Sequence, residues 1–310
     1  MTTFTIIVPV YNGELYISET INSILVNSLN QNKEIIVIND GSTDQTLKVL
    51  QSYKQEITII SKPNGGEANA VNQGIDLAVG RYILVVNADD PLISEELFTL
   101  TQNILDARED LVAVYPDWQM IDMVNKVIST KYCSEYSFEE LVGEFNCIPG
   151  PGTVFRANEA KQIGGRSAEY KFVSDYDFWL RLACKGYFLR IPKVLAQWRS
   201  HDASTSIGLR GYAMALERID VVEKFLANYP QNLKLTQQAR ACALYNAAIL
   251  AFFDPVVPGR KWMVKALGIK RGWIKSSKLH IVAYLLMLPI SRSVYKTLTG
   301  FRSTQKINHK

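Results

Sequence analysis

Short apolar runs alternate with amphipathic stretches over the first third of the chain. Five runs are apolar nearly throughout and rich in β-branched residues, as in buried strands: Phe4–Val10, Glu34–Asn39, Ile57–Ser61, Arg81–Asn87 and Leu111–Tyr115. The stretches between them have apolar residues at helical spacing and predict helices over Gly13–Asn27, Asp44–Tyr53, Gly66–Val79 and Ser94–Arg108. Strands that are apolar on both sides need cover on both sides. The alternation therefore predicts a doubly wound α/β fold, with a mostly parallel sheet and flanking helices.

The pattern changes after residue 117. The chain there predicts a hairpin that turns at Val124-Asn125-Lys126, a short strand over Thr153–Arg156 and a helix over Asp175–Gly186. Two later amphipathic patterns, Tyr212–Tyr229 and Leu233–Phe253, predict a helical C-terminal region. We therefore expect two domains, an α/β domain over residues 1–207 and a helical, basic region over residues 208–310.

The two expected domains differ in charge. Twelve of the 34 Lys and Arg residues lie between Pro255 and Lys310, where there is no Asp or Glu, so the rest of the chain has 22 basic and 30 acidic residues. A basic tail on an acidic body indicates an anionic partner. Within residues 255–310 the apolar run Leu279–Ile290 is too short to span a bilayer; a segment lying on an anionic membrane and a buried bundle helix explain it equally well. No nucleic-acid-binding module accompanies the basic residues, so nucleic acid is not an expected partner.

Cysteines and the N-terminus indicate a cytoplasmic protein. Cys133, Cys147, Cys184 and Cys242 form no C-x-x-C pair, so a zinc site is not expected. The first residues run directly into a strand, without the basic and apolar regions of a secretory signal. We expect reduced thiols that serve as packing residues, and a location in the cytoplasm or, if the tail meets lipid, on the inner face of the cell membrane.

Acidic residues follow two of the predicted strands, at the edge of the sheet where such folds bind ligands. Asp40 ends the second strand, where a turn residue and a hydrogen-bond acceptor for a ribose or a base are equally good explanations. The fourth strand runs straight into Asn87-Ala88-Asp89-Asp90-Pro91. Mg²⁺ or Mn²⁺ needs only one or two carboxylates when substrate phosphates supply further oxygens, so Asp89 is a candidate metal ligand. Asp90 before Pro91 also fits a turn and helix cap.

Three further motifs are weak on their own. The pair Gly65-Gly66 fits either a turn or a close approach of the backbone to a ligand. Asp175, at the start of a predicted helix, fits a helix cap as well as a catalytic carboxylate. His201, the one histidine before residue 208, fits a packing or surface residue more often than a ligand.

Taken together, six motifs in this order resemble the family 2 glycosyltransferases with the GT-A fold: VPVYN, NDGSTD, GGEANAVNQG, GRYILVVNADD, SDYDFWLRL and WRSHDASTS. The resemblance covers about Thr3 to Ser206. It implies an inverting transfer of a sugar from a nucleoside-diphosphate sugar, a UDP- or dTDP-sugar foremost, to a hydroxyl of a glycan or lipid-linked glycan. It also implies Mn²⁺ or Mg²⁺ as cofactor and a place in polysaccharide biosynthesis for the cell envelope.

The same resemblance implies roles for individual residues. Asp175 matches the catalytic base, Asp89 the metal-binding last acid of the D-x-D motif, and His201 a histidine that reaches the metal or the pyrophosphate. Nucleotide contacts are implied for Pro9, Tyr11, Asn12, Asp40, Asn69, Asn87 and Ala88. Acceptor contacts are implied for Thr153 and Asp90.

Two positions depart from the family pattern. Asn87 stands where the family more often has the first acid of D-x-D, and Val71 interrupts an Ala-Arg-Asn stretch. These changes bear on the metal contacts rather than on the class, and a catalytically inactive module that binds nucleotide sugars is the alternative function. A dehydrogenase or P-loop enzyme is disfavoured, because neither G-x-G-x-x-G nor a P-loop motif is present.

Overall fold

The structure is a computed structural model that describes residues 2–146, 149–200, 211–250 and 259–269. By their internal contacts the residues divide into two compact units, Met1–Leu209 and Arg210–Lys310, each of which is described by itself below.

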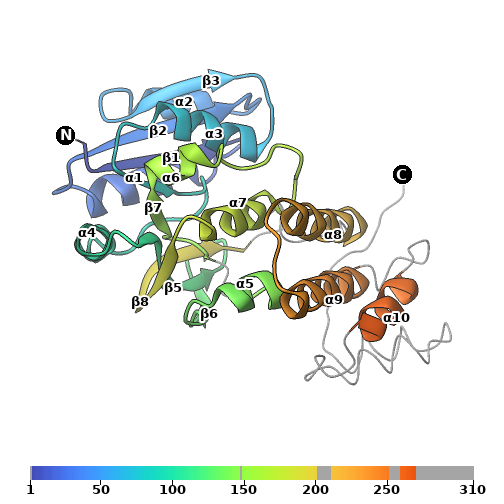
Figure 1. Cartoon of the computed structure of the whole chain (residues 1–310). Coiled ribbons are helices and arrows are strands. Elements are labelled where there is room, and N and C mark those ends of the chain that lie inside the picture. The colour runs from blue at the N-terminus through green and yellow to red at the C-terminus, as the bar shows by residue number, and fades with distance from the viewer. Residues whose placement is uncertain (1, 147–148, 201–210, 251–258, 270–310) are drawn as a thin grey trace, which may run out of the picture. The chain divides into compact units, whose positions relative to one another are not determined.

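A mixed sheet forms the centre of the first unit (Figure 1). Its strands within the described residues are β1 (Phe4–Val10), β2 (Lys33–Asp40), β3 (Thr58–Lys62), β4 (Tyr82–Val85), β5 (Leu111–Ile121), β6 (Val127–Lys131), β7 (Val154–Arg156) and β8 (Tyr187–Arg199). The strand order is β3-β2-β1-β4-β7-β5-β6, and β8 pairs with β5. Strands β3, β2, β1 and β4 are mutually parallel, as are β5 and β8, whereas β7 and β6 run antiparallel to their neighbours. The predicted mostly parallel sheet is thus confirmed.

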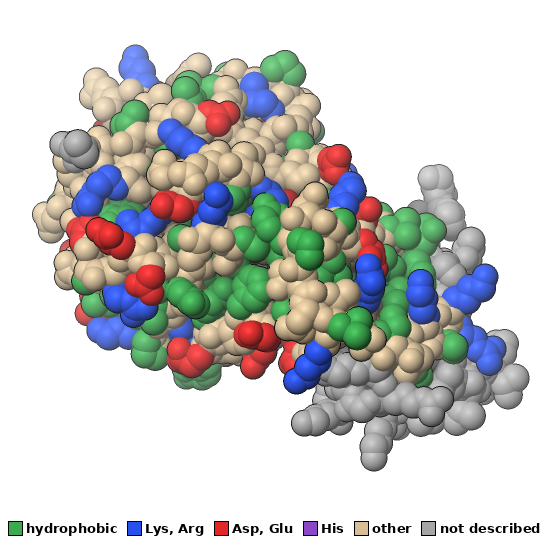
Figure 2. All heavy atoms as spheres, in the orientation of Figure 1, with side chains coloured by type: hydrophobic (Ala, Val, Ile, Leu, Met, Phe, Trp, Pro, Cys, Tyr) green, Lys and Arg blue, Asp and Glu red, His purple; other side chains and the backbone are tan. Residues whose placement is uncertain are grey.

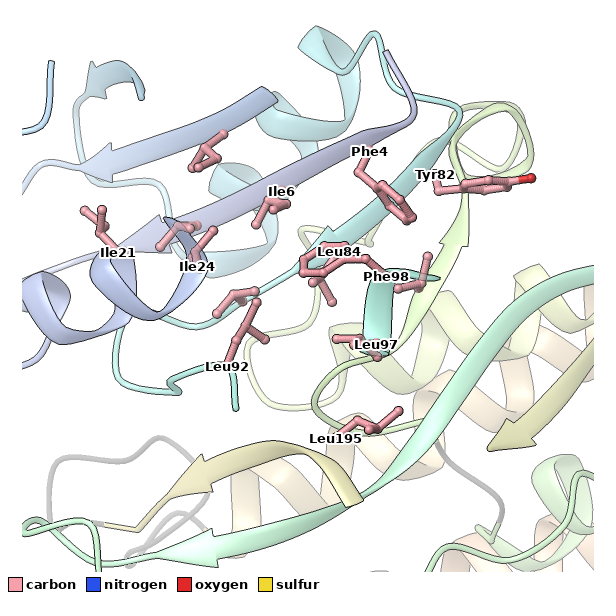
Figure 3. Packing of buried hydrophobic residues seen from close by; sticks show 14 of the residues in the cluster. Phe4, Ile6, Ile21, Ile24, Tyr82, Leu84, Leu92, Leu97, Phe98 and Leu195 are labelled. Carbon is pink, nitrogen blue, oxygen red and sulfur yellow. The ribbon is translucent and has the colours of Figure 1, made fainter. Parts of the chain in front are cut away.

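Helices cover both faces of the sheet, which explains why its central strand, β1, is buried along its whole length. The helices are α1 (Ile17–Asn27), α2 (Thr46–Gln51), α3 (Glu67–Leu77), α4 (Glu96–Ala107), α5 (Phe138–Glu144), α6 (Ala157–Gln162) and α7 (Ser174–Ala183). Helices α1 and α4 bury Ile21, Ile24, Leu97 and Phe98 against the side of β1 and β4 that carries Phe4, Ile6 and Leu84 (Figure 3). Ala70 of α3 packs against Ile36 and Ile38 of β2 in a separate cluster. At Gly74 a Cβ atom would lie 2.4 Å from Ile7, so glycine lets α3 lie directly on β1.

The sequence prediction located most elements and missed some of their ends. The predicted hairpin is β5–β6, with Asn125 in its turn at φ 67°. Strand β4 ends at Val85 rather than Asn87, because the chain turns there and Asp90 N donates to Asn87 O. Helix α2 begins at Thr46 rather than at the predicted Asp44, and its N-cap is Gln45. The Asp44 carboxylate instead accepts hydrogen bonds from the backbone N–H groups of Glu14 and Thr46, and so joins two loops.

Strand β8 was not predicted at all. Its sequence, YFLRIPKVLAQWR, contains a proline and charged residues that hide the alternation. Pairing with β5 along 111–121 nevertheless makes it the longest strand of the described residues, and it ends at Arg199.

The second unit is helical. It contains α8 (Gly211–Asn228), α9 (Leu233–Leu250) and α10 (Gly259–Ile269), with α9 in contact with both others. Helix α9 buries mostly alanine, which allows close packing, and Tyr212 stacks on Trp262 with ring centroids 6.2 Å apart. Among the described residues no helix is long and apolar enough to cross a membrane. The segment Leu279–Ile290 lies outside the described residues.

Candidate active site

The carboxylate of Asp40 closes the loop that follows β3. Asp40 is 3% exposed, and it accepts hydrogen bonds from Gly65 N at 2.9 Å, Gly66 N at 2.8 Å and the Lys62 ammonium. Gly66 has φ 86°, so its lack of a Cβ atom permits this turn just before α3 begins. The paired glycines therefore bring the backbone close to Asp40. Oδ2 has one donor and keeps an acceptor position for a further N–H or O–H group.

The loops after β1 and β2 are joined through Asn12. Its Oδ1 accepts a hydrogen bond from Thr43 N at 2.8 Å, and its own N–H donates to Ser42 Oγ at 3.0 Å. Asn12 has φ 52°, a conformation that asparagine tolerates better than most residues. Beside it, Pro9 is buried in β1, while Tyr11 is 54% exposed and presents its ring to solvent at the edge of the sheet. Tyr11 is thus available to a ligand, whereas the Asn12 side chain fixes the loop.

The two acids after β4 differ in their surroundings. Asp90 is buried; its Oδ1 accepts from Arg199 N at 2.7 Å and its Oδ2 from Asn87 Nδ2 at 2.8 Å. Burial, and next the charge of Asp89, raise the pKa of the Asp90 carboxyl well above its ordinary value. Asp89 remains partly exposed. Asp90 therefore organises the turn through protein donors, and it does not cap the following helix, whose N-cap is Glu95.

Arg199, the last residue of β8, holds this turn in place. Its side chain is fully buried, and the guanidinium lies 4.7 Å from the centre of the Tyr16 ring. Besides its backbone bond to Asp90, it donates side-chain hydrogen bonds to Asp89 O at 2.8 Å, Asn125 Oδ1 at 2.7 Å, Asp122 O at 3.1 Å and Glu19 Oε2 at 3.0 Å. One side chain thus connects α1, the turn after β4 and the β5–β6 hairpin.

Replacing Arg199 with methionine is expected to destabilise the protein by about 3–5 kcal/mol, because two backbone carbonyls and the Glu19 carboxylate lose their buried cation. Urea unfolding of Arg199→Met against wild type measures the loss. Arg81→Met serves as the matched control, since Arg81 pairs with Asp106 while 46% exposed and should contribute less than about 1 kcal/mol. Equal unfolding midpoints for the two variants would show that the Arg199 contacts do not hold the turn.

Asp175 lies in the first turn of α7, two residues beyond its N-cap Val173, so it is not the helix cap. The residue is solvent-exposed, yet surrounding protein atoms raise the pKa of its carboxyl above the ordinary value. Arg166 opposes this shift of the Asp175 pKa and Glu67 adds to it. The Asp175 side chain is therefore open to solvent, while nearby protein atoms disfavour its charged form.

A single segment connects the surroundings of Asp40 and Asp175. Its first part, Gly65-Gly66, donates to Asp40, and Glu67, which follows, pairs with Arg166 at 2.7 Å. One turn later, Asn72 exchanges two hydrogen bonds with the backbone of Arg166. Sequence reasoning did not select Arg166 or Arg199. Arg199 sits inside a motif used for the resemblance, but nothing in its local pattern shows that it is buried.

Other predicted site residues fall in different places. The Ala88 carbonyl accepts a hydrogen bond from the Thr20 hydroxyl, and the Asn69 side-chain amide donates one to Gly65 O. Ala88 thus supports the loop after β4, and Asn69 supports the loop between β3 and α3. Thr153 is buried and its hydroxyl donates to Gly150 O, which leaves its expected acceptor contact untested. His201 lies outside the described residues.

The residues present fit a cation bound jointly with phosphates. No cluster of three His, Cys, Asp or Glu side chains within the described ranges could hold a metal ion by itself. Asp89 offers hard oxygen ligands, and its negative charge raises the pKa of the neighbouring Asp90 carboxyl. A cation bound to Asp89 would relieve the repulsion between the two acids. A Mg²⁺ or Mn²⁺ ion that takes its other ligands from a diphosphate and water needs no more than this.

Comparison with known proteins agrees with this arrangement. The model of the family "Glycosyl transferase family 2" matches residues 5–153. An uncharacterized glycosyltransferase of Rickettsia typhi is 32% identical over 249 residues, which cover 76% of this chain and 73% of that protein. Chondroitin synthase of Pasteurella multocida is 30% identical over 207 residues, 66% of this chain but 21% of that longer protein.

Solved structures show the same fold at low identity. Residues 1–349 of S. aureus TarS, solved with UDP-GlcNAc, align with a TM-score of 0.66 and 17% identity, covering 91% of this chain and 81% of that one. The mannosyltransferase PcManGT of Pyrobaculum calidifontis, solved with GDP-Man and Mn²⁺, aligns with a TM-score of 0.55 and 16% identity, covering 96% and 88%. By its family match, its relatives and its sheet, the chain belongs to glycosyl transferase family 2 and has the GT-A fold.

Proposed function

We propose that this glycosyltransferase moves a sugar from a UDP- or dTDP-sugar to a hydroxyl of a glycan or lipid-linked glycan, with inversion, in the synthesis of a cell-surface polysaccharide. The observation that carries the proposal is the exposed, desolvated carboxyl of Asp175 in the unit where Asp40 ends β2 and Asp89 follows β4. Support for the donor and product comes from neighbours: TarS was solved with UDP-GlcNAc, and relatives include a chondroitin synthase and a teichoic acid biosynthesis protein.

Asp175 is proposed as the general base. An acceptor hydroxyl has a high pKa and is a weak nucleophile until a positioned base takes its proton. Desolvation raises the pKa of Asp175, which makes its carboxylate a stronger base than an ordinary aspartate. As the proton moves to Asp175, the acceptor oxygen attacks the anomeric carbon and the bond to the nucleoside diphosphate breaks. Attack from the side opposite the leaving group inverts the anomeric configuration.

Asp89 and His201 are proposed to hold the divalent ion, with Asn87 and Ala88 beside the diphosphate. When bound, such an ion stabilises the negative charge that develops on the leaving diphosphate. The Arg199 guanidinium keeps Asp89 in position by donating a hydrogen bond to the backbone carbonyl of Asp89. Asp40 is proposed to bind the nucleoside through the acceptor position left on Oδ2, with Pro9, Tyr11, Asn12 and Asn69 lining that pocket.

A panel of UDP-, dTDP- and GDP-sugars tests the donor. We expect one UDP- or dTDP-sugar to bind, and we expect EDTA to weaken that binding at least about tenfold, because Asp89 would hold a cation that neutralises charge on the diphosphate. Isothermal titration calorimetry with Mn²⁺ and with EDTA measures both. Preference for a GDP-sugar, or binding unaffected by EDTA, would contradict the corresponding part of the proposal.

One observation favours a second function, a module that binds nucleotide sugars without transfer: Asn87 replaces an acid and donates its amide to Asp90. The two functions differ in whether nucleoside diphosphate is released from the bound donor in the presence of Mn²⁺. A transferase releases it, whereas a binding module does not. Tight binding with no release, even with a range of acceptors, would establish the module.

The second part of the proposal concerns the C-terminal residues. We place transfer in residues 1–207 and a peripheral contact with an anionic membrane in residues 255–310, supported by the twelve basic and no acidic residues of that tail. The protein would then work in the cytoplasm at the inner face of the cell membrane, where a lipid-linked acceptor is found.

A further inference from the structure

The β5–β6 hairpin of the first unit exposes an unusual number of apolar side chains. Five of them within ten residues are solvent-exposed: Met123 at 63%, Val124 at 79%, Val127 at 45%, Ile128 at 56% and Tyr132 at 71%. Single exposed apolar residues are common on protein surfaces, whereas several gathered on one short hairpin are typical of an interaction site. On the face drawn in Figure 2, basic, acidic and hydrophobic side chains are interspersed.

The hairpin is a built structure whose conformation the turn fixes. The carboxylate of Asp122 accepts hydrogen bonds from Val124 N and Lys126 N, both at 2.9 Å. Asn125 takes the left-handed conformation that the tip requires, and its Oδ1 accepts from Arg199. The exposed apolar side chains are therefore held outward on a defined scaffold.

Charge on the hairpin selects an anionic partner. Between Trp118 and Tyr132 the charged residues are Asp122, Lys126 and Lys131. The Asp122 carboxylate is turned to the hairpin's own backbone, while both lysines are exposed. Apolar side chains that enter the acyl boundary, with lysines and a tyrosine at headgroup level, are what an anionic bilayer binds.

We propose that the β5–β6 hairpin inserts Met123, Val124 and their apolar neighbours into an anionic membrane surface. This docking is independent of the transfer reaction and of the tail. Its consequence rests on the proposed function: because Arg199 bonds both Asn125 and Asp89 O, docking would set the reaction site at a fixed height and angle to the membrane that carries the acceptor.

Hydrogen–deuterium exchange on the full-length wild-type chain locates the contact. With vesicles containing phosphatidylglycerol, the backbone amides of residues 122–131 should exchange several-fold more slowly, and pure phosphatidylcholine vesicles should give little of this protection. Unchanged exchange of the hairpin on anionic vesicles, or equal protection by both lipids, overturns the proposal. Protection that appears without vesicles as protein concentration rises also overturns it, since it identifies a second copy pairing with the β6 edge.

Matched double variants test the side chains. Met123→Ser/Val124→Ser should lower the partition coefficient onto anionic vesicles by about tenfold in flotation, because two apolar side chains no longer enter the bilayer. Val26→Ser/Val79→Ser removes two equally exposed apolar side chains, at 72% and 66%, on other elements and should leave partitioning unchanged. Both variants keep the tail, so its contribution cancels in the comparison. Equal flotation of the two double variants overturns the proposal.

Discussion

Asp175→Asn is expected to lower transfer by roughly two to four orders of magnitude, the usual contribution of a general base. The amide keeps the size of the carboxyl and can still accept the hydrogen bond from Tyr176 N, so the fold and donor binding should be retained. Initial rates of nucleoside diphosphate release with acceptor present measure the loss. Asp76→Asn, the same change at an exposed position of α3, is the control.

The raised pKa of Asp175 also fixes the direction in which stability and activity should change with pH. Because the folded protein raises the pKa of Asp175, the ionised carboxyl destabilises the fold near neutral pH, and this group favours folding at low pH. Asp175→Asn should therefore unfold at the same temperature as wild type or a higher one. In wild type, kcat/KM should fall as pH falls through the raised pKa of Asp175. Arg166→Met removes a cation that lowers the pKa of Asp175. This variant should therefore lose kcat/KM at a higher pH than wild type, so that the acid limb of its pH profile moves to higher pH.

Two outcomes would remove Asp175 from this role. Near-normal turnover of Asp175→Asn would show that another group takes the proton. An acid limb that stays in place in Arg166→Met would show that the limb reports a different residue.

Asp89→Asn is expected to lower transfer by roughly three orders of magnitude and to weaken its dependence on the divalent ion, since that ion contributes several kcal/mol of charge stabilisation at the leaving group. The backbone carbonyl that accepts from Arg199 is unchanged by this substitution, so the turn should persist. Titration of activity with Mn²⁺, together with circular dichroism, separates lost binding from lost fold.

Asp110→Asn is the control for Asp89, because Asp110 is an exposed aspartate whose carboxylate pairs with Arg108. It should titrate with Mn²⁺ as wild type does. Full activity of Asp89→Asn with an unchanged Mn²⁺ midpoint would mean that Asp89 is not a ligand.

Much of the fold could be read from the sequence, because periodicity reports which face of an element is buried. Phe4–Val10 is a strand with the bounds that the sequence predicts, and Asn125 marks the hairpin turn. The failures have local causes. Pro192 and the charges of β8 conceal its pairing with β5, and the Asp44 and Asp90 carboxylates, which lie near predicted helix starts, accept hydrogen bonds from distant backbone N–H groups instead.

The sequence alone located the acids that follow the strands, since an apolar run that ends in carboxylates is a local pattern, and the order of six motifs indicated the class through their resemblance to a family. The tertiary structure decided what each acid contacts. Asp40 is bound by backbone N–H groups 25 and 26 residues away, and Asp89 by a side chain 110 residues away. Of the two adjacent acids, the structure buries Asp90 against protein donors and leaves Asp89 partly exposed. Such partners come together only when the sheet brings distant loops to one edge, and no periodicity in a single stretch records which loops those are.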